Sequence, residues 1–109
     1  MLFRSVVIPF HVSDEEKLAS IEEAVAIIAD PENQPVLVHC WAGAHRTGAV
    51  IGVYRVSHCG WPEESARVEL ERWGGSSRGT RWPGRILHAY CSRHQAAAAR
   101  GVGDLAGAP

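Results

Sequence analysis

A run of three aliphatic residues, Val36-Leu37-Val38, limits the fold of this chain more than any other feature. Consecutive apolar residues without polar alternation are typical of a strand that is buried on both faces, as strands of a parallel sheet are. A loop that starts at His39 follows the run and leads into a helix expected over residues 47–58. A buried strand, a loop and a helix in this order indicate an α/β domain.

The segments before this unit fit the same architecture. Residues 2–8 predict a short strand that ends at a proline. Ser13 and Glu16 have the spacing of a capping box, which marks the start of a helix. The apolar residues of that helix recur on one stripe: Leu18, Ile21, Val25 and Ile28. A turn over residues 30–35, which contains two prolines, is expected to end it.

Two more helices are expected after residue 60. The first starts at Pro62, a residue suited to the first helical turn, and ends at Gly74. A loop over residues 76–84 separates it from a last helix over residues 86–99. We therefore expect an α/β domain with a parallel-sheet core flanked by helices. This core would occupy residues 1–100, and residues 101–109 would form a flexible tail.

Composition excludes several classes of protein. The chain has 109 residues, of which 46% are apolar and 21% charged, as expected for one folded domain rather than a disordered chain. A net charge of −1 argues against nucleic-acid binding. No apolar stretch is long enough to span a bilayer, and no signal pattern opens the chain. Three cysteines without paired spacing argue against a disulfide scaffold. We expect a cytoplasmic protein that contacts no membrane.

The charges are unevenly distributed along the chain. Residues 14–32 contain seven acidic residues and one lysine, whereas residues 72–100 contain six arginines and no acidic residue. Such blocks are usually solvated faces. The alternative is that the arginine-rich block attracts an anionic substrate, which requires both blocks to flank the same cleft.

The loop from His39 to Gly48 has the composition of an anion site. A strand that leads to a helix N-terminus directs unpaired N–H groups and the helix dipole at a bound anion. Gly43 allows these N–H groups to converge, and Arg46 adds a planar fork of donors that matches two phosphate oxygens. Cys40 lies at the base of the loop, where this field is expected to lower its pKa from ~8.5 to between ~3.5 and ~7.5. The thiol is then a nucleophile.

This loop resembles the signature of the protein tyrosine phosphatase superfamily. The stretch from His39 to Gly48 matches the pattern His-Cys-x5-Arg-Thr-Gly, with Cys40 and Arg46 at its defining positions, and is most similar to the dual-specificity branch. The resemblance covers about residues 6–90. It implies hydrolysis of a phosphate monoester, on a phosphorylated protein or a small phosphate ester, without a metal or another cofactor.

The resemblance also implies a role for each residue of the loop. Cys40 attacks phosphorus and forms a thiophosphate intermediate, while Arg46 binds the phosphate. Thr47 donates its hydroxyl to the sulfur when the sulfur leaves, and His39 is buried and orients the loop. The backbone N–H groups that bind the remaining phosphate oxygens belong to Trp41, Ala42, Gly43, Ala44, His45 and Arg46.

The identity of the general acid stays open. In the family that the loop resembles, an aspartate about thirty residues before the cysteine protonates the leaving group. Asp14 is the nearby aspartate, but its place beside Ser13 also fits a helix-terminal acid, whose charged form the helix dipole stabilises. His11 lies closer to the expected spacing and titrates near neutral pH, although it also fits an ordinary surface histidine. The acid is therefore His11, Asp14 or absent.

The start of the chain suggests an incomplete sheet. The family has further strands and a helix before the segment at residues 8–10, where this chain almost begins. Two strands are a thin sheet for several helices. We therefore expect an N-terminally shortened domain, or one that a partner chain completes; the sequence does not indicate an oligomeric state.

Phosphotyrosine or a small aryl phosphate is the expected substrate. The ending His45-Arg46-Thr47-Gly48 is also similar to a plant and fungal atypical branch, some members of which act on inositol pyrophosphates. One alternative is a pseudophosphatase or interaction module that binds phosphorylated partners but lacks an efficient acid. Another is a thiol enzyme of the arsenate reductase or rhodanese type. The ending Arg46-Thr47-Gly48 argues against rhodanese, and no nearby second cysteine supports reductase chemistry.

Overall fold

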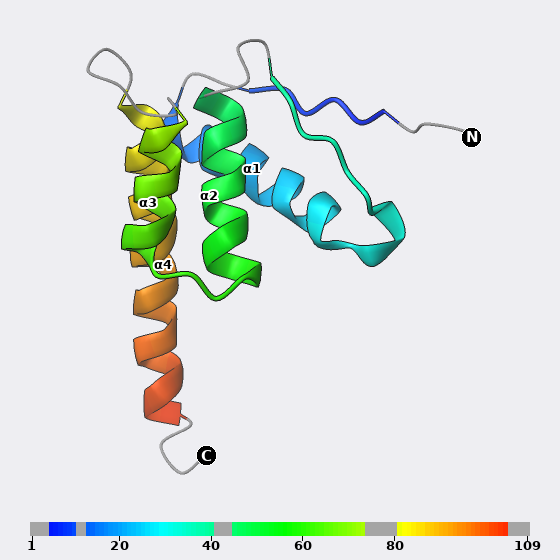
Figure 1. Ribbon diagram of the computed structural model, residues 1–109. Coiled ribbons are helices and arrows are strands. Elements are labelled where there is room, and N and C mark those ends of the chain that lie inside the picture. Colours follow the sequence, from blue (N-terminus) through cyan, green and yellow to red (C-terminus); the bar gives the residue numbers. More distant parts are fainter. Residues whose placement is uncertain (1–4, 11–12, 41–44, 74–80, 105–109) are drawn as a thin grey trace.

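Helices form the regular structure of the described residues. The computed structural model describes residues 5–10, 13–40, 45–73 and 81–104, with side chains to residue 95 (Figure 1). Each of the four helices expected from the sequence is present. The elements are, in chain order, α1 (Asp14–Ala29), the short 3-10 helix η1 (Pro31–Asn33), α2 (His45–His58), α3 (Glu63–Arg72) and α4 (Trp82–Asp104).

The start and end of α1 follow from its capping residues. The Ser13 hydroxyl accepts a hydrogen bond from the Glu16 backbone N–H at 3.2 Å, which confirms the predicted cap. At the other end the Asp30 carboxylate accepts a hydrogen bond from the Glu32 N–H at 2.9 Å. This bond caps η1, so the chain turns away from α1 where the sequence predicts a turn.

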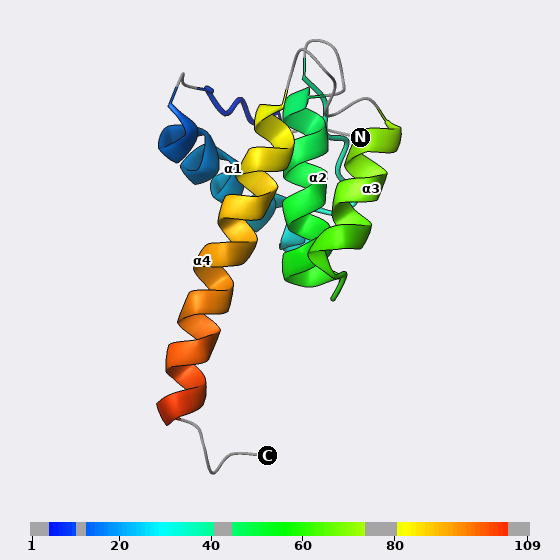
Figure 2. The ribbon, with the colours of Figure 1, turned by 90° about the vertical axis from the view of Figure 1, so that its left-hand side faces the viewer.

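The hydrophobic core forms around α2. This helix contacts α1, α3 and α4, and it runs between α1 and α3 in the views of Figures 1 and 2. The predicted stripe of α1 is confirmed for Leu18, Ile21 and Val25, which are buried, while Ile28 is half-buried. The core also contains these buried residues of the other helices: Ala49, Val50, Val53, Ala66, Ile86, Leu87, Tyr90 and Cys91. Burying each large apolar side chain contributes about 1.5–3 kcal/mol to folding.

Ion pairs between α1 and α4 join the acidic and basic blocks of the chain. The Arg85 guanidinium lies 2.8 Å from the Asp14 carboxylate, and the Arg93 guanidinium lies 3.5 Å from that of Glu22. Two of the arginines of the basic block are thus paired with carboxylates of the acidic block. The blocks therefore help to hold two helices together, rather than only forming separate solvated faces.

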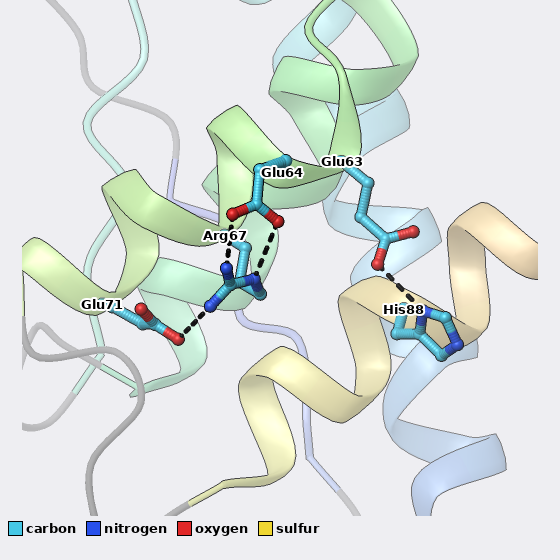
Figure 3. Close-up of polar contacts among 5 residues, drawn as sticks. All are labelled: Glu63, Glu64, Arg67, Glu71 and His88. Atoms are coloured by element: carbon cyan, nitrogen blue, oxygen red, sulfur yellow. Dashed lines mark hydrogen bonds and ion pairs between the residues drawn. The ribbon is translucent and has the colours of Figure 1, made fainter.

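The surface of α3 carries a second set of polar contacts (Figure 3). Arg67 forms ion pairs with Glu64 and Glu71, which lie three residues before it and four residues after it on the same helix. Glu63 points away from these residues, and its carboxylate lies 2.8 Å from Nδ1 of His88 on α4. The contact between Glu63 and His88 links the start of α3 to α4.

The two predicted strands are not confirmed. Residues 5–10 and 34–40 are extended but form no strand in the described part of the chain, and residues 2–4 lie outside it. The side chains of Val7 and Leu37 are 85% and 87% exposed, so these segments lack the cover that a parallel sheet requires. An aliphatic run forms a buried strand only where neighbouring segments pair with its backbone and cover both of its faces. The expected parallel-sheet core is therefore absent from the described residues.

The last helix is longer than its sequence suggests. It starts at Trp82, inside the predicted loop, and continues to Asp104, so residues 101–104 are helical rather than part of the expected tail. Pro83 is compatible with this start because the first turn of a helix has no partner for a backbone N–H. Four alanines at residues 96–99 have the highest helix propensity of any residue and favour continuation.

A substitution at Gly52 would show how closely α2 packs against α3 and α4. A Cβ atom at Gly52 would lie 3.6 Å from the nearest methyl carbons of Leu70 and Leu87, which is ordinary van der Waals contact. Gly52→Ala should therefore raise the free energy of unfolding by about 0.5–1 kcal/mol, because alanine favours the helical state. Urea titration of the native and variant chains would measure this change.

Gly60 provides the matched control for this substitution. Its φ of 72° lies in the left-handed region, and no atom is close enough to hinder an added Cβ. Gly60→Ala should lower the free energy of unfolding by about 1–2 kcal/mol through backbone strain alone. A loss of stability in Gly52→Ala would contradict the packing of α2 described above.

Candidate active site at the start of α2

Cys40 and the start of α2 lie on either side of the predicted loop. Cys40 ends the described part of the extended segment and is half-buried, and α2 begins five residues later at His45. The first N–H groups of a helix have no partner within the helix and carry its positive dipole end. The loop residues Trp41, Ala42, Gly43 and Ala44, as well as the candidate acid His11, lie outside the described residues.

Arg46 is in the first turn of α2 and its side chain is exposed. Its guanidinium carbon lies 6.0 Å from the centre of the Phe10 ring, which is a cation–π contact. None of the carboxylates in the described residues forms an ion pair with it. The N–H donors of Arg46, which would bind two oxygens of a phosphate, are therefore not paired with an acidic side chain among the described residues.

Thr47 has a buried hydroxyl oxygen without a hydrogen-bond partner among the described residues. Leaving a buried polar group unpaired costs about 1–3 kcal/mol, so such groups are uncommon in folded proteins. The hydroxyl is held in the first turn of α2, beside Arg46 and after the loop. A hydroxyl in this place is a donor available to a group bound in the loop.

His39 does not occupy the position that the resemblance implies. It is exposed, whereas the resemblance predicts a buried histidine that orients the loop. Side chains of an extended segment point alternately to opposite sides. Val38 and Cys40 are half-buried, and Val38 packs against the core, so His39 between them faces outward. The predicted burial of His39 is therefore wrong for this structure.

Asp14 is placed as a helix-terminal acid. Its two carboxylate oxygens accept hydrogen bonds from Arg85 at 2.8 and 3.1 Å, and Lys17 lies 3.8 Å away. The hydrogen bond from the Arg85 guanidinium lowers the pKa of the Asp14 carboxyl below its ordinary value, and Lys17 acts in the same direction. This environment favours the ionised form, which has no proton to donate to a leaving group.

The other two cysteines lie in different environments. Cys59 is exposed and Cys91 is buried between α4 and the core; neither forms a disulfide. The pKa of the Cys91 thiol is raised to about 11, mainly by burial and additionally by the nearby Glu63 carboxylate. A thiol with so high a pKa is mostly protonated near neutral pH and a poor partner for redox pairing with Cys40.

Aromatic residues beside Arg46 were not selected from the sequence as part of the site. The Phe10 ring packs against that of Trp82, with their centres 5.7 Å apart, and Lys17 lies over the Trp82 ring. The sequence signal that could have identified Phe10 is its place in the Ile-Pro-Phe segment, which is part of the resemblance described above. Its contact with Arg46 joins residues that are 36 positions apart and leaves no local pattern.

The described residues indicate neither a metal centre nor a membrane span. No three histidine, cysteine or acidic side chains among them are grouped in a way that could hold a metal ion. None of the helices in this part of the chain combines the length and apolar character that crossing a membrane requires.

The relation of this chain to known proteins agrees with the arrangement at α2. Residues 9–83 match the sequence model of the tyrosine phosphatase family. This chain belongs to the tyrosine phosphatase family. No solved structure matches it significantly.

Several curated relatives are phosphatases by name. A putative tyrosine-protein phosphatase OCA1 of Debaryomyces hansenii is 43% identical over 60 residues, which are 55% of this chain and 30% of that protein. Inositol diphosphatase DSP2 of Oryza sativa subsp. japonica is 56% identical over 41 residues, 38% of this chain and 19% of the relative. Inositol diphosphatase SIW14 of Saccharomyces cerevisiae is 49% identical over 35 residues, which are 32% of this chain and 12% of that protein. The chain spans less than a third of the length of these relatives.

The pairing of Asp14 with Arg85 predicts a stability difference that depends on pH. A carboxyl whose pKa is lower in the folded state stabilises the fold above its unfolded pKa of about 4, and loses this effect as the pH falls through the folded pKa. Asp14→Asn should therefore lower the midpoint of thermal unfolding by a few degrees at most at pH 7. This difference should disappear near pH 2.

Glu15→Gln is the matched control, since Glu15 is also an exposed acid in the first turn of α1. It shares the interaction with the helix dipole but has no arginine partner in the described residues. Thermal unfolding of the three chains between pH 2 and pH 7 would separate the two effects. Equal losses in both variants at pH 7 would show that the ion pair with Arg85 contributes nothing.

Proposed function

We propose that this chain hydrolyses phosphate monoesters through a covalent phosphocysteine on Cys40, with Arg46 binding the phosphate. The observation that best supports this function is the composition of the start of α2. There a half-buried cysteine is followed, across a short loop, by a helix N-terminus. Among the described residues, this terminus provides a guanidinium that no carboxylate pairs with and a buried hydroxyl without a hydrogen-bond partner.

The proposed reaction has two steps. In the first, the Cys40 thiolate attacks phosphorus, and the new S–P bond forms while the P–O bond to the leaving group breaks. The electron pair of that bond goes to the leaving oxygen, which takes up a proton. In the second step water attacks phosphorus, loses a proton and breaks the S–P bond, so that inorganic phosphate leaves and the electron pair returns to sulfur.

Each residue at the start of α2 has a role that follows from its chemistry. The dipole of α2 and the backbone N–H groups of the loop stabilise both the thiolate and the negative charge on the phosphoryl oxygens. Arg46 binds two of these oxygens with its planar fork. The Thr47 hydroxyl donates a hydrogen bond to the sulfur and stabilises the thiolate when it leaves in the second step.

The environment of Asp14 limits the substrates that this site would hydrolyse well. Because Arg85 lowers the pKa of its carboxyl, Asp14 is a weak candidate for the general acid, and His11 remains the other candidate. Substrates with a stable leaving group need little protonation. We therefore propose aryl phosphates, including phosphotyrosine, as monoester substrates, and in addition the diphosphate groups of inositol, whose leaving group is a phosphate. The names of the inositol diphosphatases among the relatives support the second class.

A phosphate-binding module without useful turnover is the second candidate. The hydrogen bonds between Asp14 and Arg85 favour it, because they remove one of the two residues that could protonate a leaving group. Such a module would bind phosphate through the same loop. Only a rate of hydrolysis distinguishes it from an enzyme.

Cys40→Ser tests the covalent mechanism. Because a serine hydroxyl is not ionised near neutral pH, hydrolysis of a chromogenic aryl phosphate should fall on the order of 10³-fold or more. Cys59→Ser is the matched control and should leave the rate unchanged, since Cys59 is an exposed thiol at the far end of α2. Undiminished hydrolysis by Cys40→Ser would refute the mechanism, and a folded native chain without activity would favour the binding module.

Thr47→Val tests the role of the buried hydroxyl. Valine has the shape of threonine, so this substitution removes the unpaired hydroxyl and should leave the free energy of unfolding unchanged or raise it. The turnover rate should fall about ten- to a hundredfold, because one donor to the leaving sulfur is lost. Rapid-quench kinetics should then detect accumulated phosphocysteine. An unchanged turnover rate would exclude this role for Thr47.

A further inference from the structure

Phe10 and Trp82 form an aromatic pair beside the start of α2. Their ring centres are 5.7 Å apart and the ring planes are tilted by 53°. Phe10 belongs to the segment before α1, and Trp82 is the first residue of α4. The aromatic pair therefore lies where three parts of the chain meet: the segment at residues 5–10, the start of α2 and the start of α4.

Each ring of the aromatic pair contacts a different cation. The guanidinium carbon of Arg46 lies 6.0 Å from the centre of the Phe10 ring, and the Lys17 ammonium lies 4.9 Å from the Trp82 ring. A positive charge over the face of an aromatic ring is attracted by the negative potential of that face. Arg46, Phe10, Trp82 and Lys17 thus form a continuous row from α2 to α1.

The aromatic pair is anchored in the fold rather than in the loop. Both rings are half-buried and pack against the hydrophobic core. The carbonyl oxygen of Pro9, directly before Phe10, accepts a hydrogen bond of 3.0 Å from the Ser20 hydroxyl of α1. Ser20 itself is buried, with 8% of its surface exposed. The position of the Phe10 ring is therefore set by α1 and the core.

We propose that Phe10, supported by Trp82, is a positioning residue that holds the Arg46 guanidinium ready for phosphate; the proposal rests on the function proposed above. An arginine side chain has many rotamers, and ordering it during binding reduces affinity. A ring restricts the guanidinium without occupying its N–H donors. A carboxylate in the same place would accept those hydrogen bonds and compete with phosphate.

Binding of inorganic phosphate to full-length chains that carry Cys40→Ser provides the test, because it does not depend on turnover. Phe10→Leu keeps an apolar side chain but removes the ring, and should raise the Kd for inorganic phosphate about two- to fivefold, as the loss of a cation–π contact predicts. Phe10→Tyr keeps the ring and should restore the native Kd. With Cys40 intact, Phe10→Leu should raise KM for an aryl phosphate and leave kcat nearly unchanged.

Trp61→Leu is the matched control. The Trp61 ring is also half-buried and also forms a cation–π contact, because the Arg55 guanidinium lies 4.5 Å from its centre. It packs near the opposite end of α2 from Arg46. Loss of this ring should leave the Kd for phosphate unchanged. An unchanged Kd in Phe10→Leu, an equal rise in Trp61→Leu, or no binding of phosphate at all would each overturn the proposal. Phosphate binding that depends on Phe10 in a chain without hydrolysis would refute only the enzymatic function.

An NMR measurement on the native chain decides the question if Phe10→Leu does not fold. A ring held against Arg46 should shift the side-chain proton signals of Arg46 upfield from those of Arg72, which is exposed and has no aromatic partner among the described residues. Coincident signals for the two arginines would show that Phe10 does not hold the guanidinium, and would overturn the proposal.

Discussion

Ala49, Val50 and Val53 of α2 are buried in one cluster with residues of α1, α3 and α4, and this packing fixes the position of α2. The functional residues depend on it because Arg46 and Thr47 lie in the first turn of the same helix. The side-chain hydroxyl of Thr47 is buried although it has no partner in the described residues, and the buried Ala49 and Val50 follow it in the same helix. The energy of the core thus maintains an arrangement at the loop that local contacts alone would not favour.

Asp14 is a residue at which an ion pair that stabilises the fold conflicts with a possible catalytic role. As a partner of Arg85 its carboxylate links α1 to α4 and stays ionised, whereas a general acid must hold a proton. The same link brings Lys17 and Trp82 together next to the segment that carries Phe10. Asp14, a candidate proton donor in the sequence, is therefore part of the link between α1 and α4 in the structure. This conflict is the physical reason to expect substrates with stable leaving groups.

The helices could be predicted because their signals are local. Ser13 and Glu16 mark the start of α1 within four residues, and the hydrogen bond between them confirms it. The exposure of Leu37 and His39 could not be predicted, because burial of an extended segment depends on which segments cover it. The contact between Asp14 and Arg85 joins residues 71 positions apart and leaves no pattern in the sequence. The extent of α4 could not be predicted, because the helix propensity of its alanines competes with the proline and glycine that precede them.

The burial of Cys91 makes its thiol a probe for the opening of the helices. Its side chain is 5% exposed among α4 and the core, and its pKa is raised to about 11, so reagents that modify thiolates cannot reach it while the helices are packed. Cys59 on the surface reacts without any such opening. The rate at which Cys91 becomes labelled therefore reports how often α4 separates from its neighbours. Cys59 and Cys91 thus provide an internal reference and a probe for the opening of the helices.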